Sequence, residues 1–128
     1  MASYEKGESM STANDVGWVY TFWADPDKDA EIVQIMGEIF EAMEEEEFPT
    51  GNVITYTLYR VPEEPGKWVM FEHFTAEGSE LHAKGQRVRE IGLRKVEMMT
   101  KPYTRMRMEP VLTRGLGEPI SPTAGKLT

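Results

Sequence analysis

Apolar and polar residues alternate along the chain in two different rhythms, which predict strands and helices in a definite order. Trp18, Tyr20 and Phe22 occupy every second position of segment 16–23, as in a strand with large side chains on one face. In segment 29–46 apolar residues recur every three or four positions instead, which is typical of a helix with one apolar stripe. The first two elements are therefore a strand and a long helix.

The following segments repeat this order with an additional strand. Segments 53–61 and 67–74 are rich in β-branched and aromatic residues, and the turn sequence PEEPG between them predicts a hairpin. A second helix is predicted over 79–99, and Pro102 ends it. In segment 103–111 arginines alternate with methionines, which predicts a last strand with one wet face and one dry face.

The predicted order β-α-β-β-α-β is that of the ferredoxin-like α+β fold, in which one antiparallel sheet carries both helices on one face. The strands have large apolar residues on both faces, for example Val53 beside Ile54 and Met70 beside Phe71. Apolar burial contributes roughly 25 cal/mol per Å², so covering the second face stabilises the protein by several kcal/mol. We therefore expect a homodimer in which two sheets pack face to face.

Length and composition fit one domain with short ends. The 128 residues are 40% hydrophobic, which is enough for one core and too little for two. We expect a folded domain over residues 16–112, with a flexible N-terminal segment over 1–15. Residues 113–128 are rich in Gly, Pro, Ser and Thr, which predicts a C-terminal tail that becomes ordered only on a partner. The sequence leaves open whether that tail crosses to the other subunit.

Charge and residue usage argue against several classes of function. Twenty-two acidic against 14 basic residues give a net charge of −8, which disfavours nucleic-acid binding, because phosphates require clustered Lys and Arg. The basic positions of the second helix, such as Arg87 and Lys95, are interpreted as a solvated face. The chain has no cysteine, and its two histidines lack a convergent set of partners, so we expect no metal site. No stretch resembles a secretory signal or a membrane span, which predicts a cytoplasmic protein without membrane contact.

Both histidines fall in the stretch KWVMFEHFTAEGSELHAKG, residues 67–85, which joins the third strand to the second helix. Glu72 and His73 are neighbours on the strand and therefore point to opposite faces. His73 faces either a pocket or the dimer partner. His82 lies near the start of the helix, where it is either a functional group or a residue that covers the core.

The element order and this stretch together resemble the antibiotic biosynthesis monooxygenase family, which belongs to the dimeric α/β-barrel superfamily. In that family the third strand typically carries a Glu followed two residues later by an aromatic residue, and the second helix opens with a His. Glu72, Phe74 and His82 stand at these places, although the family more often has Trp where this chain has Phe74. The resemblance covers residues 16–111.

Members of this family oxygenate aromatic polyketides without metal or flavin, degrade haem, or have no assigned reaction. The haem-degrading branch typically has a Trp near the place of His82 and an axial His nearly three turns later, where this chain has Ile91 and Gly92. It also uses an Asn on the first strand, and segment 16–23 has none. The resemblance therefore implies a monooxygenase that needs no cofactor and acts, with dioxygen, on an aromatic polyketide-like, quinol or anthrone substrate.

The resemblance also assigns roles to residues. His82 takes a proton from the substrate, because imidazole titrates near neutral pH, and Glu72 orients it or raises its basicity. A deprotonated phenol or quinol can then give an electron directly to dioxygen, so the protein need only bind it, exclude water and stabilise the anion. The expected substrate-binding residues are Trp18, Tyr20, Phe22, Tyr56, His73 and Phe74.

Other interpretations stay open at this point. Aromatic residues on strands usually pack in the core, and a strand Glu is often solvated or paired with a residue such as Arg60. The same fold also supports a cyclase, isomerase or decarboxylase that uses His82 without oxygen. A non-enzymatic barrel that binds a small molecule, or whose aromatics fill their own pocket, is a further alternative. The sequence does not identify the substrate.

Overall fold

The computed structural model describes residues 14–112 of the chain. The predicted tail, 113–128, lies outside the described residues, and so does the predicted N-terminal segment, 1–15, apart from its last two positions. One of these, Asp15, is buried and contacts His73. The folded domain therefore includes at least this residue of the predicted N-terminal segment.

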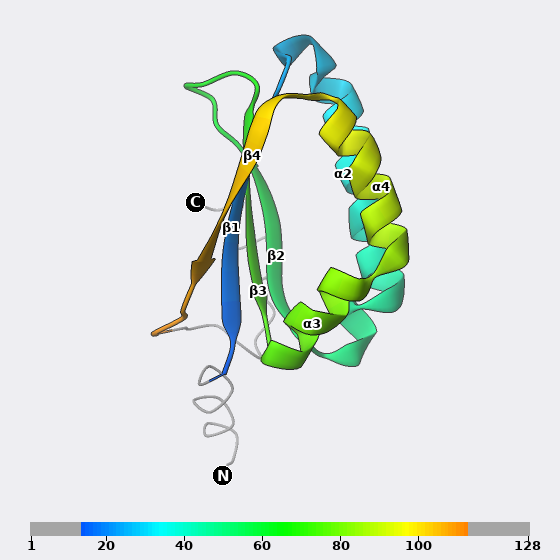
Figure 1. The fold of residues 1–128 in the computed structure, drawn as a ribbon, viewed down its shortest axis with the longest axis vertical. Helices are drawn as coiled ribbons and strands as arrows, with labels where there is room; N and C mark the ends of the chain where they lie inside the picture. The colour runs from blue at the N-terminus through cyan, green and yellow to red at the C-terminus, as the bar shows by residue number, and fades with distance from the viewer. Residues whose placement is uncertain (1–13, 113–128) are drawn as a thin grey trace, which may run out of the picture.

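Within the described residues the strands form an antiparallel sheet in the order β2-β3-β1-β4, and the helices cover one of its faces (Figure 1). The elements are β1 (Val16–Ala24), α2 (Asp29–Glu46), β2 (Val53–Arg60), β3 (Lys67–Phe74), α3 (Ala76–Lys84), α4 (Gln86–Glu97) and β4 (Met99–Met108), with 3-10 turns at Pro26–Lys28 and Phe48–Thr50. None of the helices in residues 14–112 has the length and apolar character needed to cross a membrane. The predicted ferredoxin-like α+β fold is confirmed.

The second predicted helix differs from the structure. Instead of one helix over 79–99 there are two, α3 and α4, which are separated at Gly85, where the backbone is extended. α3 begins earlier than predicted because the hydroxyl oxygen of Thr75 accepts a hydrogen bond from a first-turn N–H, at 3.0 Å. β4 begins at Met99, before Pro102, and an edge strand tolerates proline because its outward N–H groups need no partner.

The core lies between α2 and the inner face of the sheet, which is the face that the helices cover. The stripe predicted from the sequence is buried in the structure. Its buried members on α2 are Ile32, Ile35, Met36, Ile39, Ala42 and Met43. On the sheet side, Phe22 is fully buried and stacks on Trp68, with 6.2 Å between the ring centroids. These contacts hold α2 firmly against β1 and β3.

The opposite side of the sheet, here called the outer face, carries exposed apolar residues. Tyr59, Phe71 and Met106 keep 49%, 41% and 58% of their surface exposed. In the register Val19 is opposite Phe71 on β3 and Met106 on β4, so apolar side chains form a band across these strands. Large apolar residues therefore occupy both faces of the sheet, as the sequence predicted.

The arginine face of β4, predicted to be wet, lies on the helix side of the sheet, and the methionine face, predicted to be dry, lies on the outer face. Arg105 is opposite Tyr20 in the register and points to the helix side, whereas Met106 is opposite Val19 and points to the outer face. Both side chains remain exposed in the single chain. The predicted dry face of β4 is therefore in contact with water in the single chain.

A pair of glycine substitutions tests the packing of α3. A Cβ atom on Gly78 would collide with the backbone carbonyl of Asn52, whereas one on Gly37, in the middle of α2, would have nothing within 4 Å. We expect Gly78→Ala to lower the free energy of unfolding by about 1–3 kcal/mol through overpacking. Gly37→Ala should raise it by about 0.5–1 kcal/mol, because alanine is the better helix former. Urea unfolding measures both values, and a stabilising Gly78→Ala would contradict this packing.

Candidate functional site

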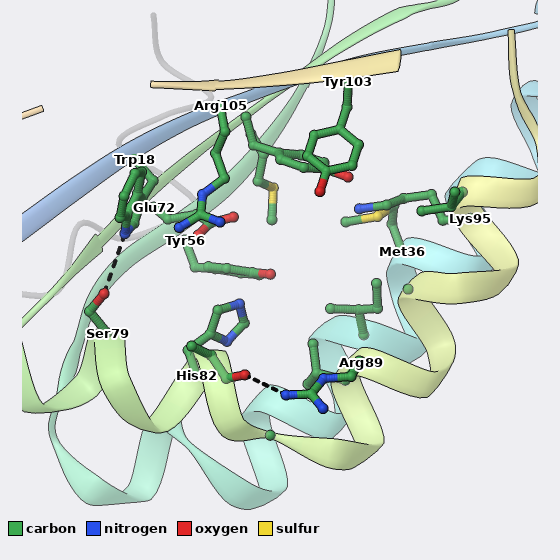
Figure 2. A pocket seen from close by; sticks show the side chains of 18 of the residues that line it. Trp18, Met36, Tyr56, Glu72, Ser79, His82, Arg89, Lys95, Tyr103 and Arg105 are labelled. Carbon is green, nitrogen blue, oxygen red and sulfur yellow. Dashed lines mark hydrogen bonds between the residues drawn. The ribbon is translucent and has the colours of Figure 1, made fainter. Parts of the chain in front are cut away.

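A cavity of about 390 Å³ lies between the inner face of the sheet and the helices (Figure 2). This volume falls within the range of about 300–1,000 Å³ that is usual for small-molecule sites. The helix side of the cavity includes Ala83, Gly85 and Gly92, whose small size leaves the space open. An open cavity argues against a barrel whose pocket is filled by its own aromatic residues.

Most of the predicted site residues line this cavity, and they come from β1, β2, β3 and α3. These are Trp18, Tyr20, Tyr56, Glu72, Phe74 and His82. Trp18 is held in place by its indole N–H, which donates a hydrogen bond to the Ser79 hydroxyl at 3.3 Å and so joins β1 to α3. The cavity thus has flat aromatic walls and two ionisable groups of predicted catalytic function.

The other two predicted substrate-binding residues lie elsewhere. Phe22 is fully buried in the core, where it stacks on Trp68. His73 is opposite Gly17 on the outer face, and its Nε2 lies 2.9 Å from Oδ2 of Asp15. Side chains alternate along β3, so the inward position of Glu72 directs His73 away from the cavity. His73 therefore belongs to the side of the sheet that we expect to face a partner.

His82 is positioned by a carboxylate other than the predicted one. Its Nδ1 lies 2.9 Å from Oε1 of Glu47, and its ring stacks on Phe74 and meets the edge of Tyr56, with centroid distances of 5.0 and 5.7 Å. In the tautomer that carries its hydrogen on Nδ1, the Glu47 carboxylate accepts this hydrogen and Nε2 keeps a lone pair. Glu72, which we expected to orient His82, makes no hydrogen bond to it.

The position of Glu47 beside His82 was not predicted from the sequence. Glu47 ends the acidic run EEEE, which looks like a solvated helix end, and Glu44, Glu45 and Glu46 are indeed exposed. Glu47 is only 8% exposed, because α2 ends at this point and the chain turns under α3. Its second carboxylate oxygen would lie 3.3 Å from a Cβ on Gly85, so the break between α3 and α4 leaves room for the carboxylate.

Glu72 is a carboxyl group that its surroundings push toward the neutral form. Burial raises the pKa of Glu72 above its ordinary value, although His82, Lys95 and Arg105 each act to lower it. Burial also raises the pKa of the neighbouring Tyr56 phenol. The Tyr56 phenol therefore keeps its proton at neutral pH and can donate a hydrogen bond, and the Glu72 carboxyl takes up a proton more readily than an exposed one.

Lys95 is a site residue that sequence analysis missed. It was interpreted as part of a solvated face, and α4 does pair outward with α2, through Arg87 with Glu45 and Arg94 with Glu38. Lys95 instead points inward, is only 8% exposed and lines the cavity, with Nζ 4.3 Å from the ring centroid of Tyr20. Burial lowers the pKa of Lys95 to about 8, although Glu72 acts to raise it.

β4 contributes two more residues that were not predicted. Arg105 lies over the ring of Trp18, with 4.0 Å from Cζ to the centroid, and Tyr103 lies 4.7 Å from Tyr20 between ring centroids. Figure 2 shows both side chains reaching from β4 toward the helices across the cavity. The strand pattern suggested that Arg105 was solvated, and only the register of β4 against β1 turns it inward.

Within residues 14–112 there is no group of three or more His, Asp or Glu side chains that could hold a metal ion. The ionisable side chains of His82, Glu72, Lys95 and Arg105 all line the same cavity. Such a set can move a proton and stabilise negative charge on the ligand.

Sequence comparisons do not assign this chain. No protein-family model matches it, and no curated protein matches its sequence.

Comparison with solved structures gives a clear fold. A Caulobacter crescentus protein, provisionally assigned as an antibiotic biosynthesis monooxygenase, superposes with a TM-score of 0.71 at 18% identity, covering 84% of this chain and 99% of that one. Rv0793 from Mycobacterium tuberculosis gives 0.66 at 17% identity, covering 78% and 98%. A variant of SnoaB, a cofactor-independent oxygenase from Streptomyces nogalater, gives 0.64 at 12% identity, covering 80% and 98%.

These structures share the fold of this chain over nearly their whole length. The resemblance to antibiotic biosynthesis monooxygenases that the sequence suggested is therefore confirmed for the fold. At these identities the likeness carries no residue roles, and the chemistry must be argued from the cavity itself.

The lowered pKa of Lys95 predicts a specific dependence of stability on pH. The folded state binds the proton less tightly than the unfolded state, whose lysine pKa is near 10.5, so charged Lys95 destabilises the fold at neutral pH. This penalty is fully present below pH 8 and disappears as the pH rises toward about 10.5. Lys95→Met should thus be more stable than the wild type at pH 7, by at most about 3 kcal/mol, and this advantage should shrink between pH 8 and 10.

Urea unfolding at pH 7, 8, 9 and 10 measures this difference. Lys101→Met is the matched control, because it removes an exposed lysine that lies over Trp23, outside the cavity. A gap between Lys95→Met and wild type that stays constant over this pH range would contradict the assignment.

Proposed function

We propose that the protein is a cofactor-independent monooxygenase that acts on an aromatic polyketide-like, quinol or anthrone substrate. The observation that carries the proposal is a histidine base, held by Glu47, inside a cavity with aromatic walls. The fold adds support, because SnoaB, which shares it, is a cofactor-independent oxygenase. The chain's own residues then supply binding, proton removal and charge stabilisation.

The first step is the removal of a proton from the substrate. Nε2 of His82 accepts this proton, and Glu47 stabilises the imidazolium that results. Glu72, in its neutral form, donates a hydrogen bond to the oxygen that carries the developing negative charge. Trp18 and Tyr56 hold the flat ring and exclude water from this part of the cavity.

The deprotonated, electron-rich ring then reacts with dioxygen. It transfers one electron to dioxygen, and the resulting radical and superoxide combine to a peroxide anion at the activated carbon. The peroxide anion takes the proton back from His82 and becomes a hydroperoxide. Loss of water from the hydroperoxide of an anthrone leaves a quinone, so one CH₂ group and one dioxygen give one C=O group and one water. The protein takes part in this sequence by forming and stabilising the anion.

A comparison of the two histidines tests this proposal. Each histidine has a carboxylate at 2.9 Å, but only His82 lines the cavity. With an anthrone such as dithranol, His82→Ala should lower the enzymatic rate of oxygen uptake by about 10²–10⁴-fold, the usual contribution of a general base. His73→Ala should keep the wild-type rate. An oxygen electrode measures both, and a wild type that consumes no oxygen with any anthrone or quinol would overturn the proposal.

A second reaction class is supported by one observation. His82, as a base, and Glu72, as an acid, both line the same cavity from different elements, which suits proton transfer within one ligand. An isomerase, cyclase or decarboxylase would use the same two residues without oxygen. Conversion of the substrate at an unchanged rate under argon would favour this class over the oxygenase.

We also propose that the active form is a homodimer built through the outer face. The band formed by Val19, Phe71 and Met106 is apolar, and a single chain leaves Phe71 and Met106 exposed and Val19 half-buried. Tyr59 meets the edge of Phe71 at 5.5 Å between ring centroids, which widens the band onto β2. A second copy offers the same band, so that two sheets can pack face to face.

A charge placed in the band should separate the subunits. Phe71→Glu should convert the dimer to a monomer in sedimentation velocity, because dimerisation would then bury two carboxylates without partners. Val33→Glu is the matched control, since Val33 is also apolar and 47% exposed but lies on α2, away from the sheet. A wild-type protein that sediments as a stable monomer would contradict the dimer.

A further inference from the structure

The cavity contains more positive than negative charge. Lys95 and Arg105 line it, and neither has a carboxylate within 4 Å among residues 14–112. Arg89 also lines the cavity. Its guanidinium donates a hydrogen bond to the backbone carbonyl of Ala83 at 2.9 Å, and this neutral acceptor does not neutralise its charge. Other basic residues of α4 point outward and pair with acids of α2, so the charges in the cavity are an exception to the pattern of this helix.

The carboxyl groups near the cavity do not balance these cations. Glu47 is engaged by His82 at 2.9 Å. Glu72 lines the cavity, but one carboxyl group cannot balance Lys95, Arg105 and Arg89 even when it is ionised. Lys95 is only 8% exposed, and a buried cation is costly unless an anion pairs with it, whereas the two arginines stay exposed. The lining of the cavity therefore carries a net positive charge.

The two cations lie over neighbouring rings of one aromatic wall. Lys95 reaches from α4 over the ring of Tyr20, and Arg105 reaches from β4 over the ring of Trp18, two positions away on the same face of β1. Figure 2 shows both side chains directed into the cavity, which Tyr103 also enters from β4. A flat ligand that lies in the cavity would therefore have its edge close to an ammonium and a guanidinium group.

We propose that the ligand of this cavity is an aromatic carboxylic acid in its ionised form, and that Lys95 and Arg105 bind its carboxylate. The planar guanidinium suits a carboxylate because it offers parallel N–H donors, and the ammonium adds a second charge. This narrows the substrate class of the proposed oxygenase and, in that respect, rests on the proposed function. In that reaction the carboxylate end anchors the ring while His82 deprotonates the opposite part.

A matched pair of ligands tests the proposal without any turnover. 2-Naphthoate and 2-naphthamide have the same ring and nearly the same shape, but only the first carries a charge at pH 7. We expect titration calorimetry to give a dissociation constant at least about tenfold lower for the naphthoate, since hydrogen bonds to charged groups discriminate by that factor or more. Equal affinities, or no measurable binding of 2-naphthoate, would overturn the proposal.

Substitutions of Lys95 and Arg105 test whether these two residues cause the preference for 2-naphthoate over 2-naphthamide. Lys95→Met and Arg105→Met should each reduce the preference for naphthoate severalfold, with the naphthamide affinity changed little, and Lys95→Arg should keep it. Lys101→Met and Arg60→Met are the matched controls, because these residues also lie over tryptophan rings but do not line the cavity. A preference that survives the double variant of Lys95 and Arg105 would also overturn the assignment.

A failure of the carboxylate site and a failure of the proposed oxygenase give different results in these experiments. 2-Naphthoate is not an oxidisable quinol, so its affinity does not depend on any reaction with dioxygen. A protein that prefers the naphthoate but consumes no oxygen with anthrones would keep the carboxylate site and lose the oxygenase. A protein that oxidises anthrones but binds 2-naphthoate and 2-naphthamide equally would keep the oxygenase and lose the carboxylate site.

Discussion

The packing of α2 on the inner face of the sheet is the interaction on which the site depends. Phe22 and Met70 from the sheet, and Met36 and Met43 from α2, are at most 2% exposed and form a rigid layer. α4 then packs beside α2 through ion pairs at the surface, and part of the space between α4 and the sheet stays open. The cavity is a consequence of this uneven covering, because α2 packs tightly on its half of the sheet, whereas α4 leaves space between itself and the other half.

The ionisable groups of the site come from both halves of the chain. Glu47 follows the first helix and His82 lies on α3, and their contact forms only when the two halves have packed together. Trp18 and Ser79 make a second link of this kind across the cavity. The base is thus tied to the completed fold, so a chain with only one half in place has no preformed site.

Sequence periodicity predicted the fold well because burial in this protein follows simple patterns. The stripe of α2 and the alternation of β3 each serve one buried face, and both elements have the predicted bounds. The break at Gly85 was missed, since one glycine in a helical pattern is usually tolerated. The space beside Gly85 holds the Glu47 carboxylate, a tertiary contact that local sequence does not reveal.

The candidate site was predictable only in part. Large aromatic residues on the inner positions of β1, β2 and β3 were expected to line a pocket, and four of them do. Lys95 and Arg105 were not found, because a basic residue in a charged helix or an alternating strand normally faces water. Their inward direction depends on the rotation of α4 and on the pairing of β4 with β1, which local sequence does not encode.

The residues at the edge of the cavity between α4 and β4 line the cavity but contribute little to the core. Leu93, Val96 and Tyr103 line this edge, yet they keep 59%, 43% and 45% of their surface exposed. Replacement of such exposed residues usually changes stability by less than about 0.5 kcal/mol. The range of ligands can therefore diverge through mutations at this rim while the α2 layer stays intact, which makes the protein a tolerant scaffold for new specificities.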